Sequence, residues 1–323
     1  MTIPCRSVSA ALSLACLLLL LPGATRAQDS IDEVMITGTR VGPRLWRVAD
    51  STHTLWILGT VEQLPKKMTW QSERVDALLG ETQLVIPANG NLDFHAGPLA
   101  AVRLYFQWRG VQTNPDHATL NMVLPGPLYA RFAALKNQYA AHDPRLEHLR
   151  PMVAAAHLYR AAESASGLGP GRIVQDTVLK LAHYHRVTVA RLSVDVEDPR
   201  GLLSQLAQLS AATEIRCLEA TMSRLETDLG PMRLRANAWA IGDVAALRRL
   251  PAPDNRAICL DAASSAPGIQ ALVARAAAQW LDTALASLRS NRVTLALRPI
   301  NDLLAPDGVL ATFRARGYSV EEP

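Results

Sequence analysis

The sequence predicts an α/β (α+β) fold that is rich in helices, with strand–helix–strand units at both ends of the chain. Three observations support this class. Alternating apolar and polar residues predict strands near both ends of the chain, at 44–61 and 293–300. Alanine-rich helical periodicity fills residues 96–166. Short helices follow the terminal strands, and such strand–helix–strand units build an α/β core.

The first half of the expected sheet lies close to the N-terminus. The segment "RLWRVADSTHTLWILGTV" (44–61) predicts a β-hairpin that turns at a Ser-Thr pair. The segment "SERVDALLGET" (72–82) predicts a short helix with Ser72 as its N-cap. The segment "QLVIPANG" (83–90) predicts a buried strand that ends in turn residues.

The same periodicities predict the rest of the chain. Further helices are expected at 125–141, 144–165, 172–186, 269–291 and 305–317, with two or three more between 200 and 250, and strands at 187–196, 293–300 and 318–322. The stretch "SGLGPGR" (166–172) predicts a loop, and because no strand precedes it, it is not a dinucleotide-binding motif. Gly242 and Asp243 predict a turn between two helices.

The N-terminus has the features of an export signal. Arg6 precedes a compact apolar run, and small residues follow, so residues 1–27 are expected to be a signal peptide that is cleaved after Ala27. Residues 28–42 are expected to be a mobile N-terminal arm, and residues 43–323 a single domain. No later run is long enough to span a bilayer, so we expect a periplasmic or secreted protein without a transmembrane segment in its mature chain.

The cysteine content and the charge distribution indicate which partners and which compartment the protein can have. The sequence has four cysteines, and removal of the signal peptide leaves Cys217 and Cys259. In an oxidising compartment such a pair is expected to form a disulfide, with two buried thiols as the alternative. The formal net charge is +4, and the basic residues are spread along the chain with few aromatic residues among them. Nucleic acid is therefore not an expected partner.

Two segments near opposite ends of the chain share a spacing. Thr54 is followed eight residues later by Glu62, and Thr294 is followed eight residues later by Asp302. Both segments are expected strands that run into turns. The spacing indicates an ancient duplication, and we expect the two strand ends to meet at a shared cleft.

Three blocks of the sequence resemble the TraB/GumN family. They are "LWRVADSTHTLWILGT", the helical "ATMSRLETDLGPMRLRANAWAIGDVAALRRL" and the ending "PDGVLATFRARGYSVE". The resemblance covers nearly the whole mature chain and is greatest to the exported GumN-like branch, which is related to the Tiki metalloproteases. It implies an α/β architecture shared with erythromycin-esterase-like and ChaN-like proteins. In this architecture a mixed sheet core is formed by two pseudo-repeated halves with inserted helices, and a cleft lies between the halves. It also implies metal-dependent peptidase or hydrolase chemistry at two Gly-x-x-His motifs.

The chain departs from the family pattern at both motifs. The corresponding segments are Gly59-Thr60-Val61-Glu62 and Pro299-Ile300-Asn301-Asp302. Glu62 and Asp302 stand at the positions of the two histidines, and a shift of one residue would place Asn301 there instead. Pro87 and Ser193 stand where the family has two glutamates. The resemblance therefore places Gly59, Thr60, Pro87, Ser193 and Asn301 along the cleft.

These departures predict a family member with a degenerate active site. A usable metal centre needs about three protein ligands, and Glu62 and Asp302 supply two. We therefore expect no cofactor and a periplasmic binding or scaffolding role, with an envelope protein, a peptide or a glycan as the partner. The alternative is a metal-dependent hydrolase that uses Glu62 and Asp302 with manganese or zinc. The two carboxylates could also form a pair for acid/base chemistry, with one pKa raised.

Overall fold

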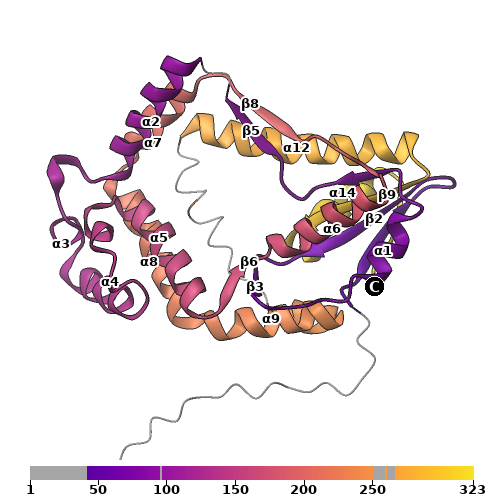
Figure 1. Cartoon of the computed structure of the whole chain (residues 1–323), viewed down its shortest axis with the longest axis horizontal. Coiled ribbons are helices and arrows are strands. Elements are labelled where there is room, and N and C mark those ends of the chain that lie inside the picture. Colours follow the sequence, from indigo (N-terminus) through magenta and orange to yellow (C-terminus); the bar gives the residue numbers. More distant parts are fainter. Residues whose placement is uncertain (1–41, 95–96, 251–258, 260–265) are drawn as a thin grey trace, which may run out of the picture. The chain divides into compact units, whose positions relative to one another are not determined.

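A computed structural model describes residues 42–94, 97–250, 259 and 266–323, which belong to one compact unit. The expected signal peptide and N-terminal arm lie outside the described residues, apart from Gly42. The structure confirms the helix-rich α/β class, because helices surround a mixed six-stranded sheet (Figure 1). Across the sheet the strands are β10 (Ser319–Glu321), β1 (Leu45–Ala49), β2 (Thr54–Thr60), β9 (Val293–Pro299), β4 (Leu84–Ile86) and β7 (Thr188–Val189).

The centre of the sheet joins the two ends of the chain. Strands β1 and β2 form the antiparallel hairpin that the sequence predicts, and β10 pairs antiparallel with β1. Strand β9 inserts between β2 and β4 and runs parallel to both. Its register against β2 pairs Gly59 with Arg298 and Thr60 with Pro299. The strand ends that carry the two motif segments are therefore neighbours.

Two smaller sheets lie outside the main one. They pair β3 (Gln63–Pro65) with β6 (Leu168–Pro170), and β5 (Asn91–Phe94) with β8 (Ser193–Val196). Strand β6 falls in the stretch 166–172, where the sequence predicts a loop. The reason is close approach: the Gly171 N–H donates to the Glu62 carbonyl at 2.6 Å. A Cβ atom at Gly171 would lie 1.8 Å from the Val61 carbonyl oxygen, so only glycine fits.

A first hydrophobic core joins the main sheet to the helices around it. These are α1 (Glu73–Leu79), α6 (Arg172–Tyr184), α9 (Leu229–Ile241), α10 (Val244–Arg249), α12 (Pro267–Ser290), α13 (Ile300–Leu304) and α14 (Val309–Ala315). Trp46, Trp239 and Trp280 are almost completely buried in it. Helix α12 contacts β2, β4 and β9 and extends to β8 and to α7 (Pro199–Ala207).

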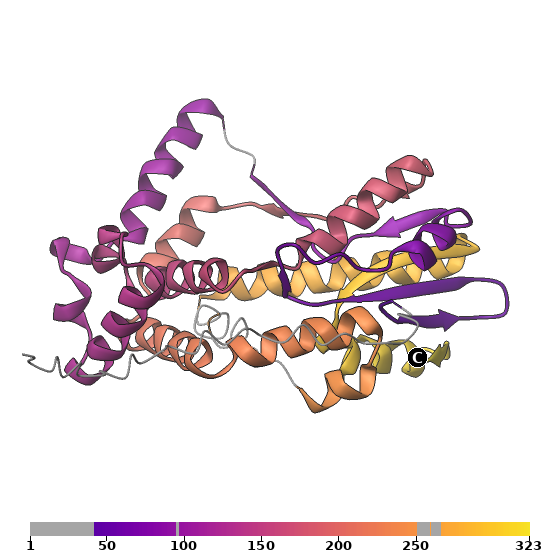
Figure 2. The ribbon, with the colours of Figure 1, turned by 60° about the horizontal axis from the view of Figure 1, so that its bottom comes forward.

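A second hydrophobic core lies within the inserted helices. It is formed by α3 (Leu120–Val123), α4 (Gly126–Tyr139), η2 (Pro144–His148), α5 (Pro151–Ala165) and α8 (Ala211–Thr227). Helices α5 and α8 lie side by side in both ribbon views (Figures 1 and 2). The remaining described helices are α2 (Pro98–Gln112) and η1 (Pro115–His117). No helix in the described ranges is long and apolar enough to cross a membrane.

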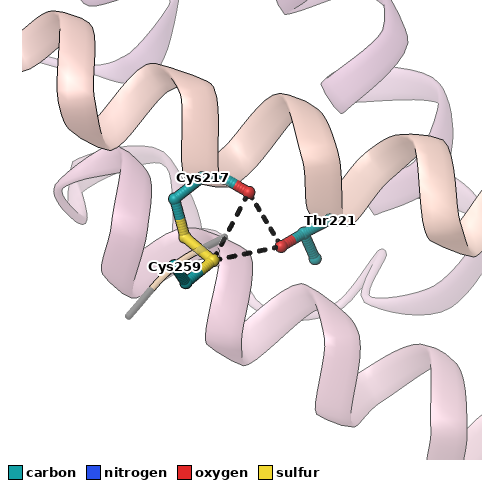
Figure 3. The surroundings of a disulfide bond; sticks show 3 residues. All are labelled: Cys217, Thr221 and Cys259. Atoms are coloured by element: carbon teal, nitrogen blue, oxygen red, sulfur yellow. Dashed lines mark hydrogen bonds between the residues drawn. A yellow bond between two sulfur atoms is a disulfide. The ribbon is translucent and has the colours of Figure 1, made fainter. Parts of the chain in front are cut away.

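The second core contains the disulfide that the sequence predicts. Cys217 of α8 is bonded to Cys259, with an S–S distance of 2.01 Å (Figure 3). The Thr221 hydroxyl donates to the Cys217 carbonyl at 2.9 Å, one turn along the same helix. The bond ties residue 259 to α8, and the expectation of a disulfide is confirmed.

Several expected element boundaries are wrong. Ser72 precedes α1, but its side chain makes no capping bond, because its backbone already has helical angles (φ −99°, ψ −1°). The expected strand 187–196 is two strands, β7 and β8, which belong to different sheets. The expected helix 305–317 begins only at Val309, because Gly308 has extended backbone and Pro306 lies in the preceding turn. Residues 200–250 hold four helices rather than two or three, because α7 to α10 are separate.

The turn between α9 and α10 has the chemistry that the sequence predicts. Gly242 adopts the left-handed conformation (φ 73°) that ends many helices, and its N–H donates to the Trp239 carbonyl. Asp243 then accepts a hydrogen bond from the Ala246 N–H at 2.8 Å and caps α10. The turn places α9 across the carboxyl end of β2, where the Trp239 indole N–H donates to the Gly59 carbonyl at 2.6 Å.

Candidate functional site

A cavity lies at the carboxyl ends of β2 and β9. Its volume is about 390 Å³. Both Glu62 and Asp302 line it, together with Thr60 and Asn301. Apolar side chains from α9, from α10 and its C-cap, and from α13 also line the cavity: Met232, Leu247, Leu250, Ile300 and Leu304. In open α/β sheets the carboxyl ends of parallel strands are the usual ligand-binding edge.

Glu62 faces an arginine from the inserted helices. Arg224 Nη2 of α8 lies 3.3 Å from Glu62 Oε2, and the Gln63 side-chain amide donates to the same oxygen at 3.3 Å. The Glu62 side chain is 38% exposed, whereas the Arg224 side chain is only 3% exposed. A charge as buried as that of Arg224 needs paired and hydrogen-bonded partners. Glu62 is one of these partners.

Arg224 belongs to a buried ionic network beneath the cavity. Its Nε lies 3.2 Å from Asp228 Oδ2, and its guanidinium stacks over the Tyr159 ring at 5.3 Å from the centroid. Arg235 of α9 binds Asp228 through two parallel hydrogen bonds of 2.8 and 2.5 Å. Asp228 lies at the junction of α8 and α9, so the network fixes the angle between these helices and holds Arg235 at the cavity wall.

A second glutamate lies behind Glu62. Glu163 of α5 is buried, and its burial raises the pKa of its carboxyl group, although a hydrogen bond from Gln63 and the charge of Arg224 act in the opposite direction. Tyr159 is one helical turn away, and burial likewise raises the pKa of its phenol. Among the described residues its hydroxyl has no hydrogen-bond partner. These groups surround Arg224 with potential acceptors.

Asp302 has an arginine of its own. Arg298, at the end of β9, forms an ion pair with the Asp302 carboxylate. The other carboxylate oxygen accepts a hydrogen bond from the Val309 N–H at 3.2 Å, at the start of α14. The Arg298 guanidinium stacks over the Trp280 ring at 4.6 Å. Asp302 is therefore held between a fixed cation and a helix N-terminus.

These residues do not fit a divalent metal ion. Both carboxylates accept hydrogen bonds from guanidinium groups, which occupy the positions that a cation would need. In the described ranges no group of three or more histidine, cysteine, aspartate or glutamate side chains could hold a metal. His185, which caps the C-terminal end of α6, lies with its Nε2 2.6 Å from Asp76 Oδ1. The carboxylate oxygens that a metal ion would need are therefore already neutralised by arginine side chains.

The other residues that the resemblance places in the cleft have different positions. Gly59 is buried within β2, and its carbonyl is bonded by Trp239. Pro87 follows β4 and is buried. Ser193 begins β8 and donates a hydrogen bond to Asp93. None of these three residues is among those that line the cavity.

Sequence reasoning did not single out the arginine network. Arg224 and Asp228 are four residues apart, a spacing that places them on one helix face, but exposed surface pairs have the same pattern. Arg235 lies seven residues after Asp228, in the next helix, α9. Glu163 lies near the end of the alanine-rich helix α5, and no neighbouring residue in the sequence indicates that it belongs to a site. Only long-range packing brings these residues to Glu62: α5 packs against α8 and β6, and α9 packs against α8 and β3.

Comparison with known proteins gives one match. The model of the TraB/PrgY/gumN family matches residues 44–322, nearly the whole chain. The chain belongs to the TraB/PrgY/gumN family. No curated protein and no solved structure matches it. The family resemblance in the sequence is confirmed, and in this family member Glu62 and Asp302 are each paired with an arginine.

Proposed function

We propose that this TraB/PrgY/gumN protein is a binding module that has lost metal chemistry and keeps the strand-end cavity as its ligand site. The observation that carries the proposal is the pairing of Glu62 with Arg224 and of Asp302 with Arg298. Each ion pair neutralises a carboxylate that catalysis would need free. The cavity nevertheless stays open, and both carboxylates and Arg298 line it. Folds commonly persist after their original chemistry is lost.

The lining favours a peptide over a glycan. Apolar side chains of α9, α10 and α13 form one wall, and the polar groups of Thr60, Glu62, Arg298, Asn301 and Asp302 lie near the strand ends. Binding sites of this kind take an apolar anchor and fix its orientation by a few polar contacts. No aromatic side chain is among the lining residues, so the cavity lacks the flat faces on which sugar rings stack. An apolar side chain of an extended peptide, or of an envelope protein, fits this lining.

Export is part of the proposal. The Cys217–Cys259 disulfide supports it, because such bonds persist in oxidising compartments such as the periplasm. The apolar N-terminal run supports it independently. In this location a binding module would meet peptide segments of envelope proteins.

Selection from a library of displayed hexapeptides tests the binding role. We expect the parent protein to enrich peptides that share an apolar anchor. The matched variant Leu304→Arg places a charge in the apolar wall and should lose these peptides. The exposed control Leu234→Arg should keep them. Enrichment that survives in Leu304→Arg, or no enrichment at all, would contradict the proposal.

The alternative function is a metal-dependent hydrolase that uses Glu62 and Asp302. It is supported by the observation that both carboxylates line one cavity. This function requires that the ion pairs of Glu62 with Arg224 and of Asp302 with Arg298 break. It also requires further metal ligands from residues outside these two pairs. Hydrolysis of the selected peptides in the presence of added manganese or zinc, lost in Glu62→Ala and Asp302→Ala, would favour this function.

A further inference from the structure

Helix α2 has an apolar outer face that the rest of the described chain leaves uncovered. None of its residues is buried. Leu99, Val102 and Phe106 are 81%, 54% and 67% exposed, and their spacing places them on one side of the helix. Arg103 and Arg109 flank this stripe. We call these five residues the α2 outer face.

The opposite side of α2 already has a partner. Helix α2 contacts α7, and its less exposed side chains, Leu104 and Val111, share one side of the helix. The ribbon in Figure 2 shows the N-terminal part of α2 standing clear of the other helices. A helix that is apolar on both sides is normally buried on both sides. The α2 outer face is thus a surface that a partner would cover.

The charge of α2 indicates what kind of partner. Between Gly97 and Asn114 the only charged side chains are Arg103 and Arg109, and there is no acidic residue. Neither arginine forms an ion pair with a described residue. Tyr105 and Trp108 are also exposed, at 55% and 45%. Aliphatic and aromatic side chains beside unpaired arginines are typical of helices that lie in the interface of an anionic membrane.

A second copy of the chain is a poorer partner. Two α2 outer faces packed together would bring four arginines close to one another, and α2 has no carboxylate to neutralise them. An anionic lipid surface can instead pair its headgroups with both arginines, while Leu99, Val102 and Phe106 insert into its apolar layer. We propose that α2 docks the protein on an anionic lipid surface, through this apolar stripe and its two flanking arginines.

Hydrogen exchange measured with vesicles tests this docking and reads out α2 itself. The full chain is mixed with phosphatidylcholine vesicles, with and without phosphatidylglycerol. We expect protection of residues 97–112 only when phosphatidylglycerol is present. Arg103→Gln and Arg109→Gln should each weaken binding about fivefold. Added salt should weaken it as well.

Matched variants separate the apolar stripe from general exposure of apolar residues. Val102→Ser with Phe106→Ser should remove the protection and lower vesicle binding about tenfold or more. Met122 of α3 and Tyr184 of α6 are 75% and 78% exposed. The control variant Met122→Ser with Tyr184→Ser should change neither the protection of residues 97–112 nor the vesicle binding. Circular dichroism checks that each variant keeps its helices.

Three results would overturn the proposal. One is no protection of residues 97–112 with anionic vesicles. Another is binding that protects only other segments and survives in Val102→Ser with Phe106→Ser. The third is a concentration-dependent dimer that protects the α2 outer face without lipid, since that result would assign the face to a second copy.

Discussion

Arg224 Nη2 of α8 lies 3.3 Å from Glu62 Oε2, although the two residues are 162 positions apart. This contact connects the first motif segment of the cavity to the inserted helices. The partner of this glutamate is thus a guanidinium, which Asp228 holds in turn.

The unequal burial of this pair predicts unequal effects of substitution. Arg224→Met leaves the buried Asp228 short of one partner and should lower the free energy of unfolding by about 3–5 kcal/mol. Glu62→Gln removes the exposed partner and should cost less than about 1 kcal/mol. Urea unfolding of both variants checks the difference. Equal losses would mean that Glu62 has a structural role as large as that of Arg224.

Glu163 predicts a pH dependence of stability. Burial raises the pKa of Glu163 above the 4.5 of an unperturbed glutamate. The protonated carboxyl therefore contributes stability that is present below the unfolded-state pKa and is lost as the pH rises through the folded-state pKa. Relative to Glu163→Gln, the parent should lose stability as the pH rises above 4.5. Urea unfolding across this range measures the effect. The exposed control Glu81→Gln should follow the parent; a difference between the parent and Glu163→Gln that does not change with pH would contradict the assignment.

The disulfide should make a large contribution to stability. It closes a separation of 42 residues. In the chain-entropy model this corresponds to about 4 kcal/mol. Thermal unfolding with and without reductant should show a lower midpoint after reduction. The double variant Cys217→Ser with Cys259→Ser should show no response to reductant, and a response as large as that of the parent would mean that another bond is being reduced.

Export should produce a defined N-terminus. Cleavage after Ala27 leaves Gln28 as the first residue. N-terminal sequencing or intact mass of the protein recovered from the periplasm or the medium checks this. A chain that begins at Met1, or one that stays in the cytoplasm, would contradict the expected signal peptide.

Local sequence signals predict much of the fold, and the long-range packing explains what they miss. The hairpin at 44–61 and the turn at Gly242 depend on neighbouring residues, and the structure contains both. Strand β6 depends on contact with β3, about 100 positions away, so "SGLGPGR" has no strand signal of its own. The same limit applies to the site. The spacing of the two motif segments predicts that Glu62 and Asp302 share a cavity, whereas Arg224 and Glu163 reach it only through helix packing.

The metal content of the purified protein tests the central claim most directly. The protein is equilibrated with manganese, cobalt or zinc, freed of unbound ions by dialysis, and measured by mass spectrometry beside the double variant Glu62→Ala with Asp302→Ala. Because Arg224 and Arg298 occupy both carboxylates, we expect far less than one ion per chain, with no difference between parent and variant. One ion per chain in the parent, lost in the variant, would contradict the account and establish a working metal centre.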